Sequence, residues 1–469
     1  MNTFTHVGLR WTVILYTTIH FITFFWENTF LLTLLSISGI ALFIFAFLYH
    51  AIKKFKLPLF IMTIATIVTI ASGDSLQEAY FYGVLQMRNI IGLLIIVPLI
   101  SWVLHEEPYI EDIMSLFYRF VHTSRRFYFS LVAFTQVISY FLLFGAIPIM
   151  YEFINVILGK QTSEAWEIYK GTALLRGFAL TTLWVISIPS FIFAVETLEA
   201  PLSIAILQGF GIAFLGTLLA TLFAYLHEKR TGISMTPVLQ ENITNILRKA
   251  SPNNALRKQN VLEFILLFVL LFGSIFLIHH FFNVPLMIVI PLAIIFWIAI
   301  FYLFKRKAYK LPKITNDYAH DGMLKQTYQL SVMLAIGVLI LTLRKTSFAT
   351  VLVNGLQFVE NEWPLINPLF LLPFLVIILG FFGLGPLTVM VLVAGIVSDM
   401  NLPYQPELIV LAITSGSVIS SIISPVIMSV IILSASNGLS ILTNGIKANW
   451  KYSIAFYIIV QLYIQLRIL

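Results

Sequence analysis

The sequence predicts an all-α, polytopic membrane protein with two inverted repeats, and three observations lead to this fold class. Hydrophobic residues make up 59% of the 469 positions and charged residues only 10%, which is outside the range of water-soluble domains. Apolar stretches long enough to cross about 30 Å of hydrocarbon, about 20 helical residues, recur along the chain. The order of segments in the first half returns in the second. We therefore expect the lipid bilayer to be the principal partner.

Composition and motifs exclude several classes of function. The chain has no cysteine, which excludes disulfides, thiolate nucleophiles and cysteine-ligated metal. Its net charge of +7 is typical of membrane proteins that keep Lys and Arg on the cytoplasmic side, so no nucleic-acid partner is expected. His279 and His280 are adjacent and point about 100° apart on a helix, a poor arrangement for metal ligands. No glycine-rich phosphate loop, H-E-x-x-H motif or G-x-S-x-G motif occurs, and we expect neither an enzyme nor a resident cofactor or metal.

The first half contains one additional helix and one complete repeat. Residues 1–28 are interpreted as an N-terminal transmembrane helix rather than a signal peptide, because no small-residue cleavage site follows the apolar stretch. The first repeat covers 29–227 and is followed by a cytoplasmic linker at 228–261. Its predicted elements are three scaffold helices within 29–105, an amphipathic arm helix on the membrane surface at 108–126, a re-entrant helical hairpin at 127–159, a broken helix at 172–195 and a closing helix at 202–226.

The second repeat, 262–469, follows the same order. Local matches set the register: Phe144-Gly145 returns as Phe382-Gly383, and Ser187 with Pro189 returns as Ser424 with Pro425, all at sequence offsets between 227 and 240 residues. The shared offset favours a repeat over chance. The predicted elements are scaffold helices within 262–344, an arm helix at 346–363, a hairpin at 364–399, a broken helix at 407–434 and a closing helix at 452–468.

Loop charges predict the orientation of the chain. Connections rich in Lys and Arg are expected in the cytoplasm, whereas those without them are expected outside. This alternation holds only if each interrupted stretch turns back to the side from which it came, and each half then makes an odd number of crossings. The two repeats must consequently be inverted, with the N-terminus cytoplasmic and the C-terminus outside the cell membrane. The predicted cytoplasmic loops are 51–57, 227–260 and 305–327, and the predicted outer connections are 26–28, 74–83, 196–201 and 279–284.

The tips of the two hairpins are candidate substrate sites. Non-helical backbone near the bilayer midplane is tolerated only against protein or a water-filled cavity, because lipid cannot satisfy its N–H and C=O groups. Ordinary turns or kinks between short helices are the alternative interpretation. The tip residues singled out are Gly145 and Pro148 in the first copy and Gly383, Gly385 and Thr388 in the second.

Each broken helix carries a proline among hydroxyl side chains. Pro189 and Pro425 each remove a helical hydrogen bond and free carbonyl groups. Nearby hydroxyls can coordinate a cation or a substrate, although Ser and Thr in membrane helices also satisfy freed backbone or allow close packing. The hydroxyl residues singled out are Thr181, Thr182, Ser187 and Ser190 in the first copy and Ser415, Ser417, Ser420, Ser421 and Ser424 in the second.

Two ionisable residues are expected deep in the hairpin and broken-helix region. Glu152 is predicted about one turn beyond the first tip and Arg176 near the start of the first broken helix, at depths that would allow them to pair. Charges inside a membrane are costly and mark functional sites. Glu152 is therefore a candidate proton-coupling acid, and Arg176 is a candidate counter-charge for an anionic substrate. A purely structural ion pair, or side chains that reach out of the hydrocarbon, is the alternative.

This plan resembles the ion transporter superfamily, which includes divalent-anion/sodium symporters. The stretch from Leu371 to Pro386, followed by Ser424-Pro425-Val426, is most similar to a poorly characterised permease-like branch. The resemblance implies elevator-type transport, arm helices that brace the scaffold, and a homodimer. The symporters carry Ser-Asn-Thr at their hairpin tips, whereas this chain has Gly-Ala-Ile-Pro and Gly-Leu-Gly-Pro, so a dicarboxylate substrate is not implied.

The expected function is secondary active transport of a small solute, with an anion favoured, coupled to Na⁺ or H⁺. A lipid or polyprenyl-phosphate translocase is the first alternative, because apolar tips suit an apolar ligand. A membrane-embedded enzyme or a non-transporting membrane protein is the second.

Overall fold

The part of the chain that the structure describes is folded into helices. The computed structural model describes residues 3–50, 52–109, 112–113, 123–158, 161, 163–232, 236–241, 254–348, 350–351, 354–355, 358, 362, 367–400 and 402–468. Within these ranges the regular structure is helical and contains no strand. Nine helical segments of the described chain are long and apolar enough to cross a membrane. The protein is thus a multi-pass α-helical membrane protein.

The chain divides into two compact units. The first unit comprises Met1–Ile100, Leu271–Asn361 and Gly395–Leu402, and the second comprises Ser101–Leu270, Glu362–Ala394 and Pro403–Leu469. Each unit therefore draws on both halves of the sequence, and α14 (Asn254–Phe282) contributes to both.

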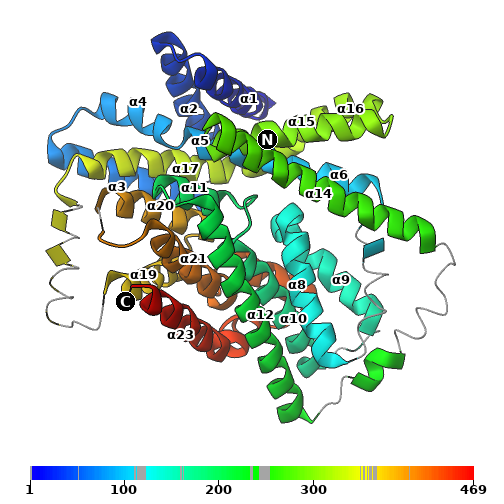
Figure 1. The fold of residues 1–469 in the computed structure, drawn as a ribbon. Coiled ribbons are helices and arrows are strands. Elements are labelled where there is room, and N and C mark those ends of the chain that lie inside the picture. Colours follow the sequence, from blue (N-terminus) through cyan, green and yellow to red (C-terminus); the bar gives the residue numbers. More distant parts are fainter. Residues whose placement is uncertain are drawn as a thin grey trace. The chain divides into compact units, whose positions relative to one another are not determined.

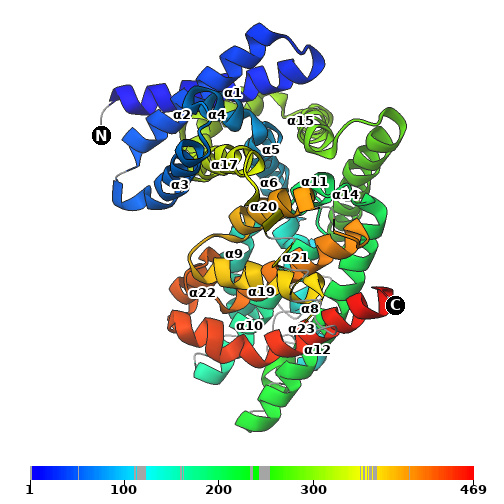
Figure 2. The ribbon, with the colours of Figure 1, turned by 90° about the vertical axis from the view of Figure 1, so that its left-hand side faces the viewer.

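In the first unit, helices from both halves pack through small residues. The backbones of α4 and α17 meet where Gly83 and Gly337 face each other, and a Cβ at Gly83 would lie 2.6 Å from the Cα of Val338. The helix α17 also packs on α3, and α1 packs on α2 (Figures 1 and 2). The main helices are α1 (Thr3–Phe25), α2 (Thr29–Tyr49), α3 (Lys56–Ser72), α4 (Leu76–Gln86), α5 (Arg88–Ile96), α15 (Leu286–Phe304), α16 (Leu311–Asp317) and α17 (Met323–Arg344).

Two segments predicted as loops in this unit are helical. The predicted outer connection at 74–83 contains most of α4, whose first turn is capped by the Ser75 hydroxyl accepting from the Glu78 N–H (3.4 Å). The predicted cytoplasmic loop at 305–327 contains α16 and a π-helical turn, Tyr318–Gly322, that leads into α17. The helix α4 is stabilised by packing on α17, which the charge pattern of its sequence did not indicate.

The second unit is built around two pairs of packed helices. The helix α10 packs on α8, and α21 packs on α19. The two helices of each pair lie side by side in both views (Figures 1 and 2). The helices of this unit from the first half are α6 (Ser101–Glu106), α8 (Ser124–Leu142), α9 (Ala146–Leu158), α10 (Glu164–Leu180), α11 (Pro189–Thr197) and α12 (Leu202–Thr231). Those from the second half are α19 (Pro368–Phe381), α20 (Pro386–Val397), α21 (Pro406–Ile423), α22 (Met428–Asn437) and α23 (Ala448–Ile468).

The predicted interruptions occur, but several boundaries differ. The helices break near Gly145, Pro189, Gly383 and Pro425, as predicted. The first broken helix begins at Glu164, eight residues before the predicted start at 172, because Glu164 and Glu167 provide a favourable acidic first turn. Most of the arm helices predicted at 108–126 and 346–363 lies outside the described residues, as does much of the linker at 228–261.

The two tips adopt their turns with different residues. Gly383 has a φ of 88°, in the left-handed region that glycine enters without steric cost. In the first copy the positive φ, 48°, belongs to Leu143 and not to Gly145. Leu143 directly follows the last residue of α8 and begins a short 3₁₀ turn, Leu143–Gly145. Gly145, which matches Gly383 in the sequence, is therefore not the residue with the positive φ.

Replacing Gly383 with alanine is expected to destabilise the protein through backbone strain alone. No atom lies within 4 Å of the position that a Cβ would occupy at Gly383, so the cost is that of a left-handed L-residue, about 1–2 kcal/mol. Gly385 has the same open surroundings without a positive φ. In thermal unfolding in detergent, Gly383→Ala should unfold at a lower temperature, while Gly385→Ala unfolds like the wild type. Equal behaviour of the two variants would contradict this assignment.

Candidate functional site

Two broken helices meet in the second unit. After α10, a single 3₁₀ turn (Thr181–Leu183) and five non-helical residues lead to Pro189, which begins α11. After α21, the chain leaves the helix at Ser424 and resumes it at Met428. The helix α21 packs against α10, against the 3₁₀ turn and against α11. The interruption of the first helix therefore lies against the second broken helix.

Each interrupted stretch before a broken helix folds back on itself. A straight helix over the 35 residues of Ser124–Leu158 would extend about 50 Å. Instead, the Tyr169 hydroxyl donates to the Ser124 carbonyl (2.8 Å), and the next residue, Lys170, donates to the Gln161 carbonyl (3.1 Å). Both ends of this stretch therefore lie at the first turns of α10.

The second stretch returns in the same way. Asn367 donates to the Gln465 side chain (2.6 Å), and Arg467 donates to the Gln405 side chain (3.5 Å). The residues before α19 and after α20 thus both lie at the last turn of α23.

A hydrogen bond across each fold-back holds the broken helix to its neighbour. The Ser187 hydroxyl donates to the Tyr140 carbonyl (2.6 Å), near the end of α8. The Ser424 hydroxyl donates to the Gly380 carbonyl (3.0 Å), near the end of α19. In both copies a hydroxyl at the break satisfies a carbonyl at the end of the preceding interrupted helix.

Glycines make two further contacts that occur in both halves. A Cβ at Gly177 would lie 2.8 Å from the Val132 carbonyl oxygen, and one at Gly416 would lie 2.6 Å from the Pro373 carbonyl oxygen. Later in each half, Gly209 and Gly445 contact the carbonyls of Leu183 and Ile423 respectively, where α10 and α21 have just ended. Together with the two serine contacts, these equivalent residues are separated by 236 to 241 positions.

Eight of the nine predicted hydroxyl residues fall into two groups. Those whose hydroxyls bond to a backbone carbonyl are Thr181, Thr182, Ser187, Ser415 and Ser424. The hydroxyls of Ser417, Ser420 and Ser421 on α21 are buried and have no hydrogen-bond partner. Buried polar groups without a partner cost about 1–3 kcal/mol and are rare. Ser190 is buried in the first turn of α11.

Two functional candidates on α8 were missed by the sequence interpretation. Thr135 and Ser139 are also buried and have no hydrogen-bond partner. They are one helical turn apart, and Thr135 contacts α10 at Gly177. The spacing of two hydroxyls four residues apart in the first hairpin helix was the available signal. Among the described residues, no group of three or more His, Asp or Glu side chains is suited to a metal ion.

The predicted tip residues lie near these breaks along the chain, yet they do not form one buried cluster. Gly145 and Gly383 are exposed, and Gly385 is partly exposed. Pro148 lies in the first turn of α9 and Thr388 in the first turn of α20, where the threonine is buried.

The expected approach of Glu152 to Arg176 does not occur. Glu152 is exposed on α9, whereas Arg176 is 3% exposed and donates to Asn449, Tyr128 and two backbone carbonyls. The pairing was wrong because α9 presents Glu152 on its outer face.

A buried ion pair that the sequence interpretation missed lies in the first two turns of α10. Lys170 and Glu167 contact each other with side chains 1% and 5% exposed. Lys170 also donates to Asn155 (2.8 Å), and Glu167 accepts from the Tyr151 hydroxyl (2.7 Å). The pair therefore connects α10 to α9. It was overlooked because the helix was expected to begin after both residues.

No protein-family model matches the sequence, and no curated protein matches it either.

Removing one member of the buried pair is expected to cost more stability than removing both charges. Lys170→Met leaves the Glu167 carboxylate buried without its partner, a change of about 3–5 kcal/mol. The double variant Glu167→Gln with Lys170→Met removes both charges and should recover most of that loss. Glu152→Gln, a change at an exposed carboxylate, should stay within about 0.5 kcal/mol. Thermal unfolding followed by tryptophan fluorescence measures all three, and a double variant less stable than Lys170→Met would contradict this account.

Proposed function

We propose that this protein is a secondary active carrier, of elevator type, that moves a small anionic solute across the cell membrane with Na⁺ or H⁺. The observation that carries the proposal is the meeting of two broken helices, each held by hydrogen bonding to a stretch that folds back on itself. Broken helices in membrane transporters present free carbonyls and helix ends to substrate and coupling ion.

The unpartnered hydroxyls support a binding role for this region. Ser417, Ser420 and Ser421 are on the helix that packs against the break of the first broken helix. A bound ion or solute would supply the partners that these hydroxyls lack. Glu152 remains the candidate proton-coupling acid, and Arg176 the candidate counter-charge.

Repeated contacts favour the inverted-repeat interpretation. Serine and glycine contacts recur at nearly constant offset in the two halves. The side-chain pairs given below, all between described residues of one unit, also join segments that the loop charges assign to the same membrane side. The pairs on the expected outer side are Glu27–Arg88, Asp74–Lys345, Asp399–Arg344 and Asn367–Gln465, and those on the expected inner side are Arg10–His320, His50–Thr327, Tyr109–Glu263 and Ser124–Thr236.

The division into units supports an elevator. Most of the predicted scaffold segments belong to the first unit, whereas both broken helices and most of both fold-back stretches belong to the second. A substrate-carrying unit that moves against a scaffold requires this segregation. We also propose that the protein forms a homodimer, as the resemblance of its sequence to the ion transporter superfamily implies.

A lipid translocase is the alternative with an observation of its own. Phe382 at the second tip is 81% exposed, and Leu143 and Phe144 flank the first tip. Apolar tips of this kind suit an acyl or prenyl chain better than a hydrated ion.

The fold-back stretches are expected to be re-entrant, and single-cysteine labelling tests this because the native chain has no cysteine. Thr123→Cys and Ser163→Cys bracket the first stretch at exposed positions. Both should react with a membrane-impermeant maleimide only after permeabilisation of the cells. Glu362→Cys and Pro403→Cys bracket the second stretch and should both react in intact cells. If the members of either pair label from opposite sides, the stretch crosses the membrane and the inverted topology is wrong.

Loss of an unpartnered hydroxyl is expected to lower solute transport without lowering the stability of the protein. Ser421→Ala removes a hydroxyl that makes no hydrogen bond, so stability should be unchanged or higher, while solute uptake should fall at least about tenfold. Ser429→Ala removes a bonded hydroxyl (2.7 Å to the Ser421 carbonyl) and should lower stability by about 1 kcal/mol.

Uptake is measured in proteoliposomes with labelled phosphate, sulfate, succinate and citrate under imposed Na⁺ or pH gradients. Saturable, gradient-dependent uptake of one of them supports the carrier. Movement of headgroup-labelled lipid without uptake of any solute would support the translocase and overturn the carrier.

A further inference from the structure

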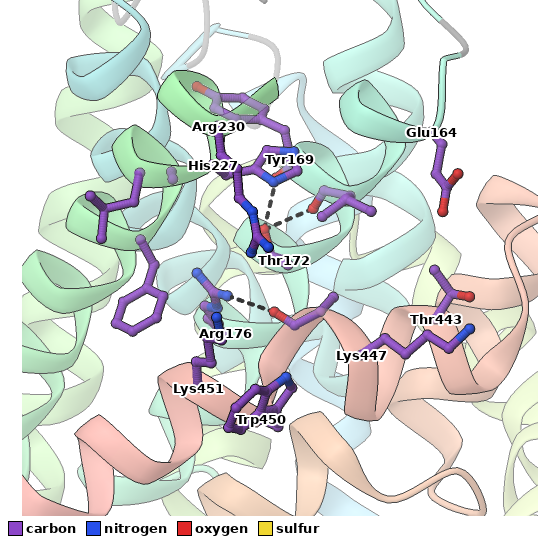
Figure 3. Close-up of a pocket in the computed structure, with 15 residues that line it drawn as sticks. Glu164, Tyr169, Thr172, Arg176, His227, Arg230, Thr443, Lys447, Trp450 and Lys451 are labelled. Atoms are coloured by element: carbon purple, nitrogen blue, oxygen red, sulfur yellow. Dashed lines mark hydrogen bonds between the residues drawn. The ribbon is translucent and has the colours of Figure 1, made fainter. Parts of the chain in front are cut away.

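A strongly cationic cavity lies within the second unit. It has a volume of about 320 Å³ and is lined by residues of α10 from Glu164 to Arg176, by the last turns of α12 and by residues 443–451 before and within α23 (Figure 3). Four lining residues are Lys or Arg, and the only carboxylate among the lining residues is Glu164.

Arg176 reaches this cavity from a buried position. Its guanidinium donates to the Asn449 side chain (3.0 Å), to the Tyr128 hydroxyl (3.1 Å) and to the Ala448 carbonyl (3.2 Å), and it lies 4.4 Å from the centre of the Tyr452 ring. All of these groups are neutral. No described carboxylate lies within ion-pair distance of Arg176, so its charge is held in place without being neutralised.

The other three cations surround the opening from two helices. Arg230 extends from the end of α12, and Lys447 and Lys451 flank the start of α23 (Figure 3). All three are exposed, and within the described chain none of them forms an ion pair. Three neutral hydroxyls also line the cavity: those of Tyr169 and Thr172, which donate to backbone carbonyls, and that of Thr443, which shares a hydrogen bond with Ser440.

The positive charge of the lining is unfavourable without a ligand. The π-helical turn Thr443–Lys447 leads directly into α23, so Lys447 and Lys451 lie one turn apart on one continuous helical stretch. Basic residues at a membrane surface are common, but a buried, unneutralised arginine behind them is not. An anion in the cavity would relieve this cost.

We propose that this cavity binds a phosphate-bearing anion. A phosphate group has the charge and the number of acceptor oxygens to engage several cations at once. Trp450 lines the cavity and is half exposed, a placement typical of the boundary between lipid and water. The group could come from a free phosphate compound or from a lipid headgroup, which basic pockets between membrane helices also bind. This inference concerns binding alone and does not require that the anion be transported.

The test uses the full chain in nanodiscs of zwitterionic phosphatidylcholine. Thermal unfolding is followed with inorganic phosphate, with chloride at equal ionic strength, and with phosphatidic acid included in the discs. A ligand that binds only the folded protein raises the unfolding temperature. The double variant Lys447→Gln with Lys451→Gln should weaken the apparent affinity at least about tenfold, since one charge-assisted hydrogen bond corresponds to about that factor. These exposed lysines are chosen because loss of Arg176 would remove four hydrogen bonds of the fold.

The matched control is Lys313→Gln with Lys325→Gln, which removes the same charge from exposed lysines that do not line the cavity. It should respond to ligand like the wild type. Stabilisation by both phosphate and phosphatidic acid would support the site for phosphate in general, and stabilisation by phosphatidic acid alone would support it with lipid as the source. Absence of stabilisation by either, or an undiminished response of the Lys447/Lys451 variant, would overturn the proposal. A protein that transports nothing could still pass this test, so the two proposals fail independently.

Discussion

Lipid offers no hydrogen-bond partner to a peptide group, and the architecture of the second unit depends on this constraint. Each interruption of an apolar helix leaves donors and acceptors that only protein or trapped water can satisfy. The hydroxyls of Ser187 and Ser424 each satisfy one such acceptor, at the end of the neighbouring helix. In each of these hydrogen bonds the donor lies at the break of one helix and the acceptor lies near the interruption of another. Two interruptions therefore lie next to each other in each copy, and this pairing brings the residues of the candidate site together.

Much of this arrangement could be predicted from the sequence, because the signals for it are local. Proline, glycine and hydrophobic length each act within one or two turns, so the positions of the breaks and the order of the helices followed from them. The start of α10 did not, since residues 164–171 are polar enough to resemble a loop until Glu167 and Lys170 are buried against α9. The conformation of Leu143 was also inaccessible, because a glycine two residues later suggested the wrong position for the turn.

The chemistry of the site was less predictable than the fold. Single serines look alike in the sequence, and whether a hydroxyl has a partner depends on the carbonyl that another helix brings to it. Ser421 and Ser424 are one turn apart, yet one lacks a partner and the other bonds to Gly380. Likewise, Arg176 is buried, but two of its hydrogen-bond partners, Asn449 and Ala448, are more than 200 positions away in the sequence. Long-range partners of this kind leave no local pattern.

The glycine contacts of Gly177 and Gly416 have a mechanical consequence. At each of them the backbone of one helix lies against a carbonyl of the next, and the glycine has no side chain of its own that could change rotamer or absorb a displacement. Two helices joined in this way slide against each other only by losing contact altogether. Each broken helix and its partner are accordingly expected to shift as one piece. Any deformation during a working cycle must then be taken up elsewhere, in turns where side chains still have room to reorient.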